Sequence, residues 1–397
     1  MKILMVMHIL THPVHMGNQQ RIYRECLYMR QRGWEVDCLY LGKNVDDDLF
    51  LTRDFFGKEH FFQYWTESLS IKAQIKQKIR NYIEESGVYR FYSLKYDADE
   101  WYLSGLAKKI RYLYEQKKYD VFWFQYMFFS KSLEELEDLP VLKIIDTHDK
   151  WANRNRIFQR NGQIPEYYYT TLWGERKALC RADLVIAIQE NEARYFERLL
   201  KNTDTQVLTI GDLVERRPVS ECSTDRYGFI GAKNRPNILG LEWFCNKVLP
   251  IVREREPGSQ FIIAGAVCDC IPDYDGMCKI GRVDCLEDFY DNIKVAVNPI
   301  QNGTGLNIKT IEALAFGRPL ITTSVGAKGI RSEKEVLLKT DSPQDFAEKL
   351  LDLLKNEERR NFLVENANDY IIEYNKKNMG TLYRVEGLLS DRQIKVM

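Results

Sequence analysis

The strongest constraint on the fold is an alternation of short buried runs with amphipathic helical stretches. The run at 2–8 leads through a loop ending at Gly17 to a helix expected at 18–32 and a second strand at 35–40. That order is a βαβ unit, whose strands lie parallel in one sheet. Further strand candidates lie at 120–125, 141–146, 184–188 and 206–209. The first half is therefore predicted to be a doubly wound parallel α/β sheet.

The pattern restarts after a polar, turn-rich stretch at 211–224. Strands are expected at 227–230, 260–264, 278–280, 295–298, 320–322 and 336–338, and helices at 236–255, 286–291, 305–316 and 343–355. A chain of 397 residues is long enough for two such domains. We expect an N-terminal domain over 1–210 and a C-terminal domain over 211–374. A final helix at 375–397 is expected to pack back on the N-terminal domain.

Charge and cysteine content exclude some classes of protein. Lys plus Arg equals Asp plus Glu at 57 each, so overall charge gives no reason to expect a nucleic-acid partner. The nine cysteines are an odd number without a paired C-x-x-C signature, which indicates reduced thiols in a cytoplasmic protein. No apolar run reaches the length of about 18 residues that a membrane-spanning helix needs.

The stretch 297–319 is the most informative part of the chain. A strand ends at Pro299, a glycine-containing loop follows, and a helix is expected to open between Thr304 and Leu306. The backbone N–H groups at a helix start, exposed beside Gly303 and Gly305, suit a diphosphate.

Lys309 and Glu312 lie three residues apart and therefore share one face of that helix. Lys309 would add a cation at the phosphates, and Glu312 would accept hydrogen bonds from ribose hydroxyls. An ordinary surface ion pair has the same spacing, so both interpretations stay open.

Six groups of residues in the second half, taken in order, resemble the donor domain of the retaining glycosyltransferases of family 4. They are 228–237 with 241–244 and 248–250, then 261–265, 280–283, 289–290 with 295–299, 309–313 with 317–319, and 322–329. The resemblance implies the GT-B fold, in which two Rossmann-like domains face each other across a cleft. It also implies transfer of a sugar, with retention, from a nucleotide diphosphate sugar to a glycan, a lipid-linked acceptor or another hydroxyl acceptor.

The resemblance assigns donor-binding roles to several residues. Glu312 corresponds to the second glutamate of the family's motif, which holds the ribose, and Thr304 stands where the first glutamate contacts the donor sugar. Lys233 or Arg235 would join Lys309 at the phosphates, although both also fit as solvated loop charges. Gly17 matches the turn by which the family's first helix approaches the substrates, or else simply precedes a helix capped by Asn18.

His148 and Asp149 are the catalytic candidates. They follow the strand expected at 141–146, so they lie at the edge of the sheet where open α/β folds bind ligands. The segment is similar to the family's His-Asp segment, whose histidine reaches the transferred sugar and phosphate. A structural histidine is the alternative.

No metal or cofactor is expected, because helix dipoles and cations neutralise the leaving diphosphate in this fold. His8, His12 and His15 are close in sequence, but their spacing across a strand end and a loop with Pro13 does not favour zinc.

Residues 43–118, rich in Tyr, Phe and Trp, are interpreted as an insertion that governs the choice of acceptor. Within them, 71–83 is a basic amphipathic stretch. It either lies on an anionic membrane, giving peripheral contact at the inner face, or presents a solvated helix face. Two rival functions are a GT-B epimerase or hydrolase acting on sugar nucleotides, and a non-catalytic subunit that binds a glycan or a partner transferase.

Overall fold

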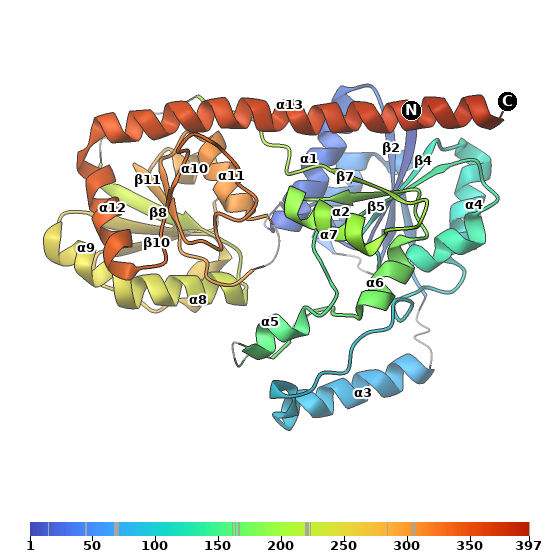
Figure 1. Cartoon of the computed structure of the whole chain (residues 1–397), viewed down its shortest axis with the longest axis horizontal. Helices are drawn as coiled ribbons and strands as arrows, with labels where there is room; N and C mark the ends of the chain where they lie inside the picture. The colour runs from blue at the N-terminus through green and yellow to red at the C-terminus, as the bar shows by residue number, and fades with distance from the viewer. Residues whose placement is uncertain are drawn as a thin grey trace. The chain divides into compact units, whose positions relative to one another are not determined.

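The computed structural model describes residues 1–14, 16–43, 46–66, 71–160, 162, 164–165, 167–218, 222, 224–283, 285–303 and 306–396. The chain forms two compact units. The first comprises Met1–Val14, Asn18–Gly211 and Thr381–Met397, and the second His15–Gly17 and Asp212–Gly380. Each unit contains one parallel sheet and its own helices (Figure 1), which confirms the prediction of two α/β domains.

The sheet of the first unit has seven parallel strands in the order β3-β2-β1-β4-β5-β6-β7. The strands are β1 (Lys2–Met7), β2 (Glu35–Leu41), β3 (Phe61–Tyr64), β4 (Val121–Gln125), β5 (Leu142–Asp146), β6 (Leu184–Ala187) and β7 (Gln206–Thr209). Every residue of β4, β5 and β6 is buried. Strands covered on both faces require continuous apolar runs, which is why these strands were recognisable in the sequence.

The helices of the first unit are α1 (Gly17–Gln31), α2 (Asp47–Phe56), α3 (Ile71–Glu85), α4 (Leu106–Lys117), α5 (Asn155–Arg160), α6 (Leu172–Leu179) and α7 (Glu190–Leu199), with short turns η1 (Lys58–His60), η2 (Val88–Arg90) and η3 (Ser130–Leu136). In Figure 1, α1 and α4 lie on opposite sides of the strands. The core between strands and helices includes Leu4, Ile110 and Phe122, all fully buried.

The region 43–118, expected to be an insertion, contributes directly to this sheet. Its strand β3 pairs with β2, with Cys38 opposite Phe61, and its helix α4 leads into β4. The four residues of β3 are too few, and too partially buried, to show a clear strand pattern. Within 43–118, the part that lies outside the sheet and the helices packed on it is mainly the segment around α3 (Figure 1).

The second unit has six parallel strands in the order β10-β9-β8-β11-β12-β13. They are β8 (Arg226–Ile230), β9 (Gln260–Ala264), β10 (Met277–Gly281), β11 (Val295–Asn298), β12 (Leu320–Thr322) and β13 (Leu338–Lys339). The helical segments are α8 (Arg235–Trp243), a π-helical turn η4 (Phe244–Val248), α9 (Leu249–Arg255), η5 (Ala266–Cys270), α10 (Glu287–Tyr290), α11 (Ile308–Ala315) and α12 (Pro343–Lys355). The single helix expected at 236–255 is thus interrupted by a π-helical turn.

The last helix, α13 (Glu357–Val396), is forty residues long and begins well before the expected position 375. Its last part, from Thr381, belongs to the first unit. There the Glu386 carboxylate accepts hydrogen bonds from the Arg32 guanidinium at 2.8 Å and from the Trp34 indole at 3.0 Å. Within the described residues, no helix is both long and apolar enough to cross a membrane.

Candidate functional site

The loop after β5 carries His148, one of the sequence-predicted catalytic residues. His148 adopts a left-handed backbone conformation with φ of 56°, and only 9% of its surface is exposed. Its imidazole stacks on the Tyr126 ring at 4.2 Å between centroids, and Nε2 is hydrogen-bonded to Oε1 of Gln125. A non-glycine residue held at positive φ at a strand end indicates a position under local constraint.

Burial keeps the His148 imidazole neutral. It lowers the pKa of His148 to about 3, against the opposing effect of the nearby Asp146 carboxylate. Asp146, fully buried, pairs with the Arg21 guanidinium at 2.8 Å, and Arg21 also reaches Glu25 at 2.9 Å. At neutral pH His148 therefore offers one N–H donor and one lone pair rather than a charge.

Asp149 lies in the same loop but has a different environment. Its carboxylate pairs with Arg154 at 2.6 Å and accepts the Lys150 backbone N–H at 2.8 Å. Asp149 directly follows His148 in the chain, but its carboxylate forms an ion pair of its own with Arg154.

Aromatic side chains line the same end of the sheet, among them Tyr126, Phe128 and Tyr167, which the sequence did not single out as site residues. The His8 ring, at the end of β1, lies 5.1 Å from Tyr126 and 5.5 Å from Phe128 between centroids. Nε2 of His8 is 2.9 Å from the hydroxyl of Tyr167, and burial lowers the pKa of His8 to about 4. His8 and Tyr126 each directly follow a predicted strand, and this position was the sequence signal that could have indicated them. No sequence signal indicated Tyr167, because 159 residues separate it from His8.

The histidines of the N-terminal loop do not form a metal site in the described part of the chain. His8 contacts Tyr167, whereas His12 contacts Thr11, and His15 lies outside the described residues. The cluster with metal-binding geometry there is Glu35, Asp37 and His60. Asp37 already accepts hydrogen bonds from Tyr119 and His60 and pairs with Lys117 at 3.1 Å, so a cation would compete with an ammonium group.

In the second unit, the loop after β8 presents Lys233 and Arg235. Both are exposed, and Arg235 is the first residue of α8. Asn234 caps this helix by accepting the Asn237 N–H at 3.0 Å, and the Asn237 amide donates to the Ala232 carbonyl at 2.7 Å. The caps hold the loop that carries both cations at the carboxyl end of β8.

The helix after β11 starts later than the sequence indicated. We expected it to open at 304–306, but α11 begins at Ile308, with Asn307 as its N-cap. The Asn307 carbonyl accepts the Thr310 N–H at 2.9 Å, so the first helical turn forms after this residue. Gly303 is therefore in the loop, exposed, and its carbonyl accepts the Lys328 ammonium at 2.8 Å. Leu306 is buried; Thr304 and Gly305 lie outside the described residues.

Lys309 and Glu312 lie on α11 as predicted, but they are not an exposed surface pair. Glu312 is only 4% exposed, and the Lys309 ammonium lies 5.7 Å from the centre of the Phe229 ring. Burial lowers the pKa of Lys309, and the neighbouring Glu312 opposes that shift. Lys309 lines a small pocket with Phe229, Tyr290 and Asn298. A partly buried cation and a buried carboxylate at the carboxyl ends of β8 and β11 form a ligand-site candidate.

A hydrogen-bonded network that sequence reasoning missed fixes α11 against the sheet. The Asn298 amide donates to the Thr310 hydroxyl at 2.9 Å, and that hydroxyl donates to the Gly326 carbonyl at 2.7 Å. Gly326 has no room for a side chain, because a Cβ there would overlap the Thr322 hydroxyl. The only sequence signal was a polar residue, Asn298, at the end of an apolar strand.

Part of the second unit is similar to a known family. Residues 224–356 match the family model described as glycosyl transferases group 1. A curated relative, an uncharacterized 44.6 kDa protein in the cps region of Klebsiella pneumoniae, is 28% identical over 166 residues. That alignment covers 38% of this chain and 43% of the relative, so the chain spans less than half of the relative's length.

Solved structures show similarity over the whole chain. The pneumococcal O-GlcNAc transferase GtfA, in complex with UDP and GlcNAc, is similar with a TM-score of 0.68 at 10% identity over 99% of both chains. A variant of S. aureus TarM, in complex with fondaparinux, α-GlcNAc-glycerol and UDP, gives 0.65 at 13% identity over 98% of this chain and 99% of that one. The two Rossmann-like parallel-sheet domains therefore have the GT-B fold.

Proposed function

We propose that this chain is a glycosyltransferase of family 4 type that moves a sugar from a nucleotide diphosphate sugar to a hydroxyl acceptor, with retention at the anomeric carbon. The observation that carries the proposal is the partly buried Lys309 beside the buried Glu312 on α11, inside the segment that matches glycosyl transferases group 1. Glycans and lipid-linked saccharides are the acceptor classes that the resemblance implies. In this proposal the reaction takes place in the cytoplasm.

Donor binding depends on the second unit. Lys309, with Lys233 or Arg235, places positive charge at the departing diphosphate, which lowers the energy of the transition state without a metal ion. Glu312 accepts hydrogen bonds from the ribose hydroxyls. UDP is the first nucleotide to test, since the similar GtfA and TarM structures contain it.

The first unit supplies His148. As a neutral imidazole it forms a hydrogen bond to the transferred sugar, and its fixed ring orientation costs no reorganisation during the reaction. Gly17, the first residue of α1, lets the backbone approach the substrates closely. Asp149 positions the loop through its pairing with Arg154.

Thr304 in place of a sugar-contacting glutamate favours a second candidate, a non-catalytic subunit that kept the fold. Such a subunit would bind a glycan or a partner transferase without turning over a donor. An epimerase or hydrolase would instead release nucleotide diphosphate without any acceptor.

Incubation of the protein with a panel of nucleotide sugars, with release of nucleotide diphosphate as the readout, tests the proposal. We expect slow hydrolysis of one donor and faster release once an acceptor glycan is present. A thermal-shift series with the matching nucleotide diphosphate should raise the melting temperature, because the ligand binds only the folded state. Absence of both signals across the panel would favour the non-catalytic subunit.

A further inference from the structure

Helix α3 buries a mixed face and leaves large apolar side chains exposed. Its buried residues are Ala73, Arg80 and Ile83, whereas Ile75 is 54% and Tyr82 69% exposed. A surface helix normally buries its apolar face. Here Ile75, Ile79 and Tyr82 instead form an exposed apolar surface without a covering element among the described residues.

The turn after α3 enlarges this surface. Phe91 is 90% exposed, the highest value among the exposed large apolar residues. We define the α3 lobe as residues 71–92, and its exposed apolar residues are Ile75, Ile79, Tyr82, Val88, Phe91 and Tyr92. Exposed apolar residues gathered on one short segment mark an interaction surface more often than chance exposure does.

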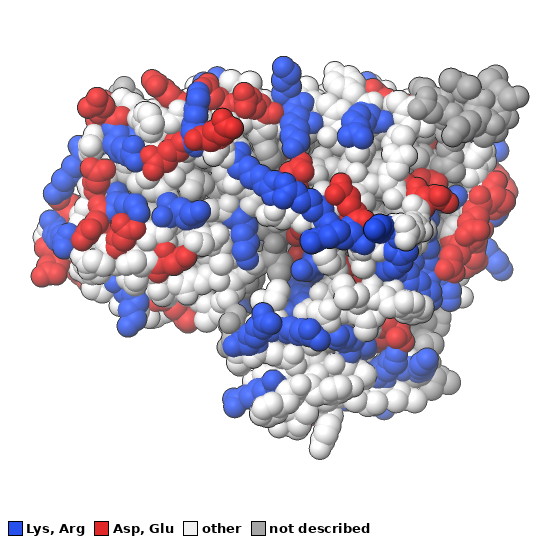
Figure 2. Space-filling model, viewed as in Figure 1, with Lys and Arg blue, Asp and Glu red and all other residues white. Residues whose placement is uncertain are grey.

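Positive charge surrounds these residues. Lys72, Lys78 and Arg90 are exposed on the lobe, and α5 adds the exposed Arg156 and Arg160. α5 is held beside η2 because the Gln159 amide donates to the Tyr89 carbonyl at 2.8 Å. Figure 2 shows Lys and Arg side chains next to a white surface on the part of the molecule that Figure 1 assigns to α3 and α5. The acidic residues of the lobe are Glu84 and Glu85, near the end of α3.

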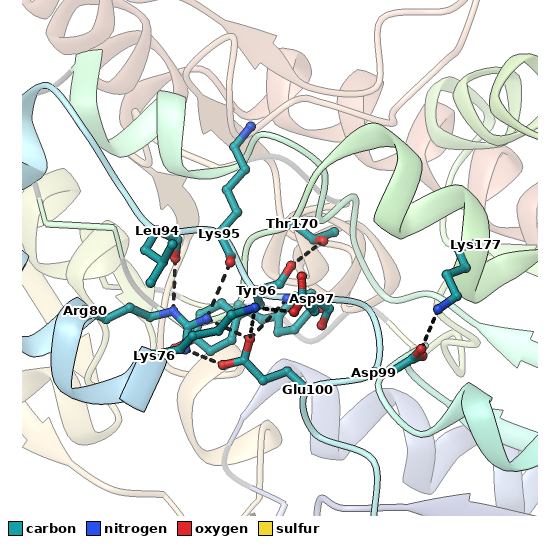
Figure 3. A network of polar contacts seen from close by, with 11 residues as sticks. Lys76, Arg80, Leu94, Lys95, Tyr96, Asp97, Asp99, Glu100, Thr170 and Lys177 are labelled. Atoms are coloured by element: carbon teal, nitrogen blue, oxygen red, sulfur yellow. Dashed lines mark hydrogen bonds and ion pairs between the residues drawn. The ribbon is translucent and has the colours of Figure 1, made fainter. Parts of the chain in front are cut away.

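The lobe is held in this orientation by specific contacts and is not merely loosely packed. The Arg80 guanidinium binds both Glu100 oxygens, at 2.5 and 2.8 Å, and donates to the Leu94 carbonyl at 3.0 Å (Figure 3). It also lies 3.5 Å above the Tyr96 ring. Lys76 reaches Asp97 in the same network. Because these charged contacts use the inward face of α3, the helix cannot rotate Ile75 and Ile79 inward without breaking them.

We propose that the α3 lobe docks on an anionic lipid surface. Isoleucine, phenylalanine and tyrosine side chains next to lysines and arginines match a bilayer interface, where apolar groups enter the acyl boundary and cations meet lipid phosphates. An exposed apolar surface that bound another protein would not need the surrounding cations. This inference does not depend on the proposed glycosyl transfer.

Co-sedimentation of the full chain with vesicles tests the proposal. We expect binding to vesicles of equal parts phosphatidylcholine and phosphatidylglycerol and little binding to phosphatidylcholine alone, with a decrease at high salt. The double change Lys72→Glu with Lys78→Glu should weaken binding at least about tenfold, since each cation near the surface contributes to attraction. Lys201→Glu with Lys247→Glu, also at exposed sites, is the matched control.

The apolar contribution is tested by Ile79→Ser with Phe91→Ser. This variant should lose vesicle binding and keep its melting temperature, whereas Phe362→Ser with Ile372→Ser, at exposed apolar sites on α13, should bind as the parent does. The proposal would be overturned if the Ile79→Ser, Phe91→Ser variant bound vesicles as strongly as the parent does. It would also be overturned if the parent did not bind anionic vesicles at low salt. A dimer in sedimentation velocity that the Ile79→Ser, Phe91→Ser variant abolishes would overturn it as well, since the surface would then bind a second copy. The thermal shift with nucleotide diphosphate should be the same in all four variants, which separates this result from failure of the proposed function.

Discussion

The His148 imidazole donates from Nε2 to the side-chain oxygen of Gln125. The orientation of the Gln125 amide is set by its nitrogen, because Nε2 of Gln125 donates to the Glu25 carboxylate at 3.0 Å. The amide oxygen therefore faces His148. Since an amide oxygen only accepts, the proton of His148 resides on Nε2 and Nδ1 carries the lone pair. A chain of contacts from α1 through β4 therefore sets the tautomer of the loop histidine.

The contribution of His148 to the stability of the protein should fall as the pH decreases from 6.5 to 4. The unfolded state binds a proton at His148 below about pH 6.5, whereas the folded state, in which burial lowers the pKa to about 3, does not. At this residue the unfolded state binds more protons in this range, so the His148 contribution rises with pH and is lost on acidification. The loss at His148 is about 3 kcal/mol at pH 4. Urea unfolding at several pH values measures it.

His148→Asn is the control for that pH dependence. Asparagine tolerates a positive φ and does not titrate in this range. The stability of the parent relative to this variant should therefore fall as the pH decreases, because the variant lacks the His148 contribution. His8, whose pKa burial lowers to about 4, and Glu175, whose pKa burial raises to about 7, titrate in both proteins and cancel in this comparison. An equal slope of stability against pH in the two proteins would show that His148 is not buried in a neutral form.

Asp146→Asn should destabilise the first unit by about 3–5 kcal/mol, the usual cost of removing one partner of a buried ion pair. Both side chains of the pair with Arg21 are 0% exposed, so the guanidinium would remain charged in the interior with Glu25, at 2.9 Å, as its remaining carboxyl partner. Asp138→Asn breaks the exposed pair with Arg111 and should change the unfolding free energy far less. Similar urea midpoints for both variants would contradict the importance of the buried pair.

The strands were predictable because parallel strands covered on both faces leave apolar runs in the sequence, as in β4 and β5. The edge strand β3 was not, since only one of its four residues is buried. The start of α11 was placed too early, because glycine and threonine before a helix do not reveal that Asn307 is the cap.

The site was predictable only where one short segment carries it. Lys309 and Glu312 share a helix, so their spacing sufficed. By contrast, the pairing of Arg21 with Asp146 joins residues 125 positions apart, and no local pattern records it. The orientation of α3 was equally hidden, because amphipathic spacing shows two faces but not which one the fold buries.

Gly265→Ala should destabilise the second unit by about 3 kcal/mol or more, from backbone strain and steric overlap together. Gly265 has φ of 87° and ψ of 179°, a conformation almost restricted to glycine, and a Cβ there would overlap the Gly231 carbonyl. Gly281→Ala is the matched control, since φ is 71° but its Cβ would meet no described atom within 4 Å. It should cost only about 1–2 kcal/mol. Equal losses in urea unfolding would show that the contact with Gly231 is unimportant.

Lys309→Met and Glu312→Gln should weaken nucleotide binding in different ways. Each change removes one charged hydrogen-bonding group and should lower affinity for UDP about tenfold to a hundredfold. Lys309 would contact phosphates, so Lys309→Met should spare uridine binding, whereas Glu312→Gln should weaken uridine and UDP alike. Isothermal titration with both ligands measures the difference, and Lys339→Met, at an exposed lysine of the same unit, is the control. If Lys309→Met weakened uridine as strongly as UDP, Lys309 would support the fold of the pocket and not contact the diphosphate.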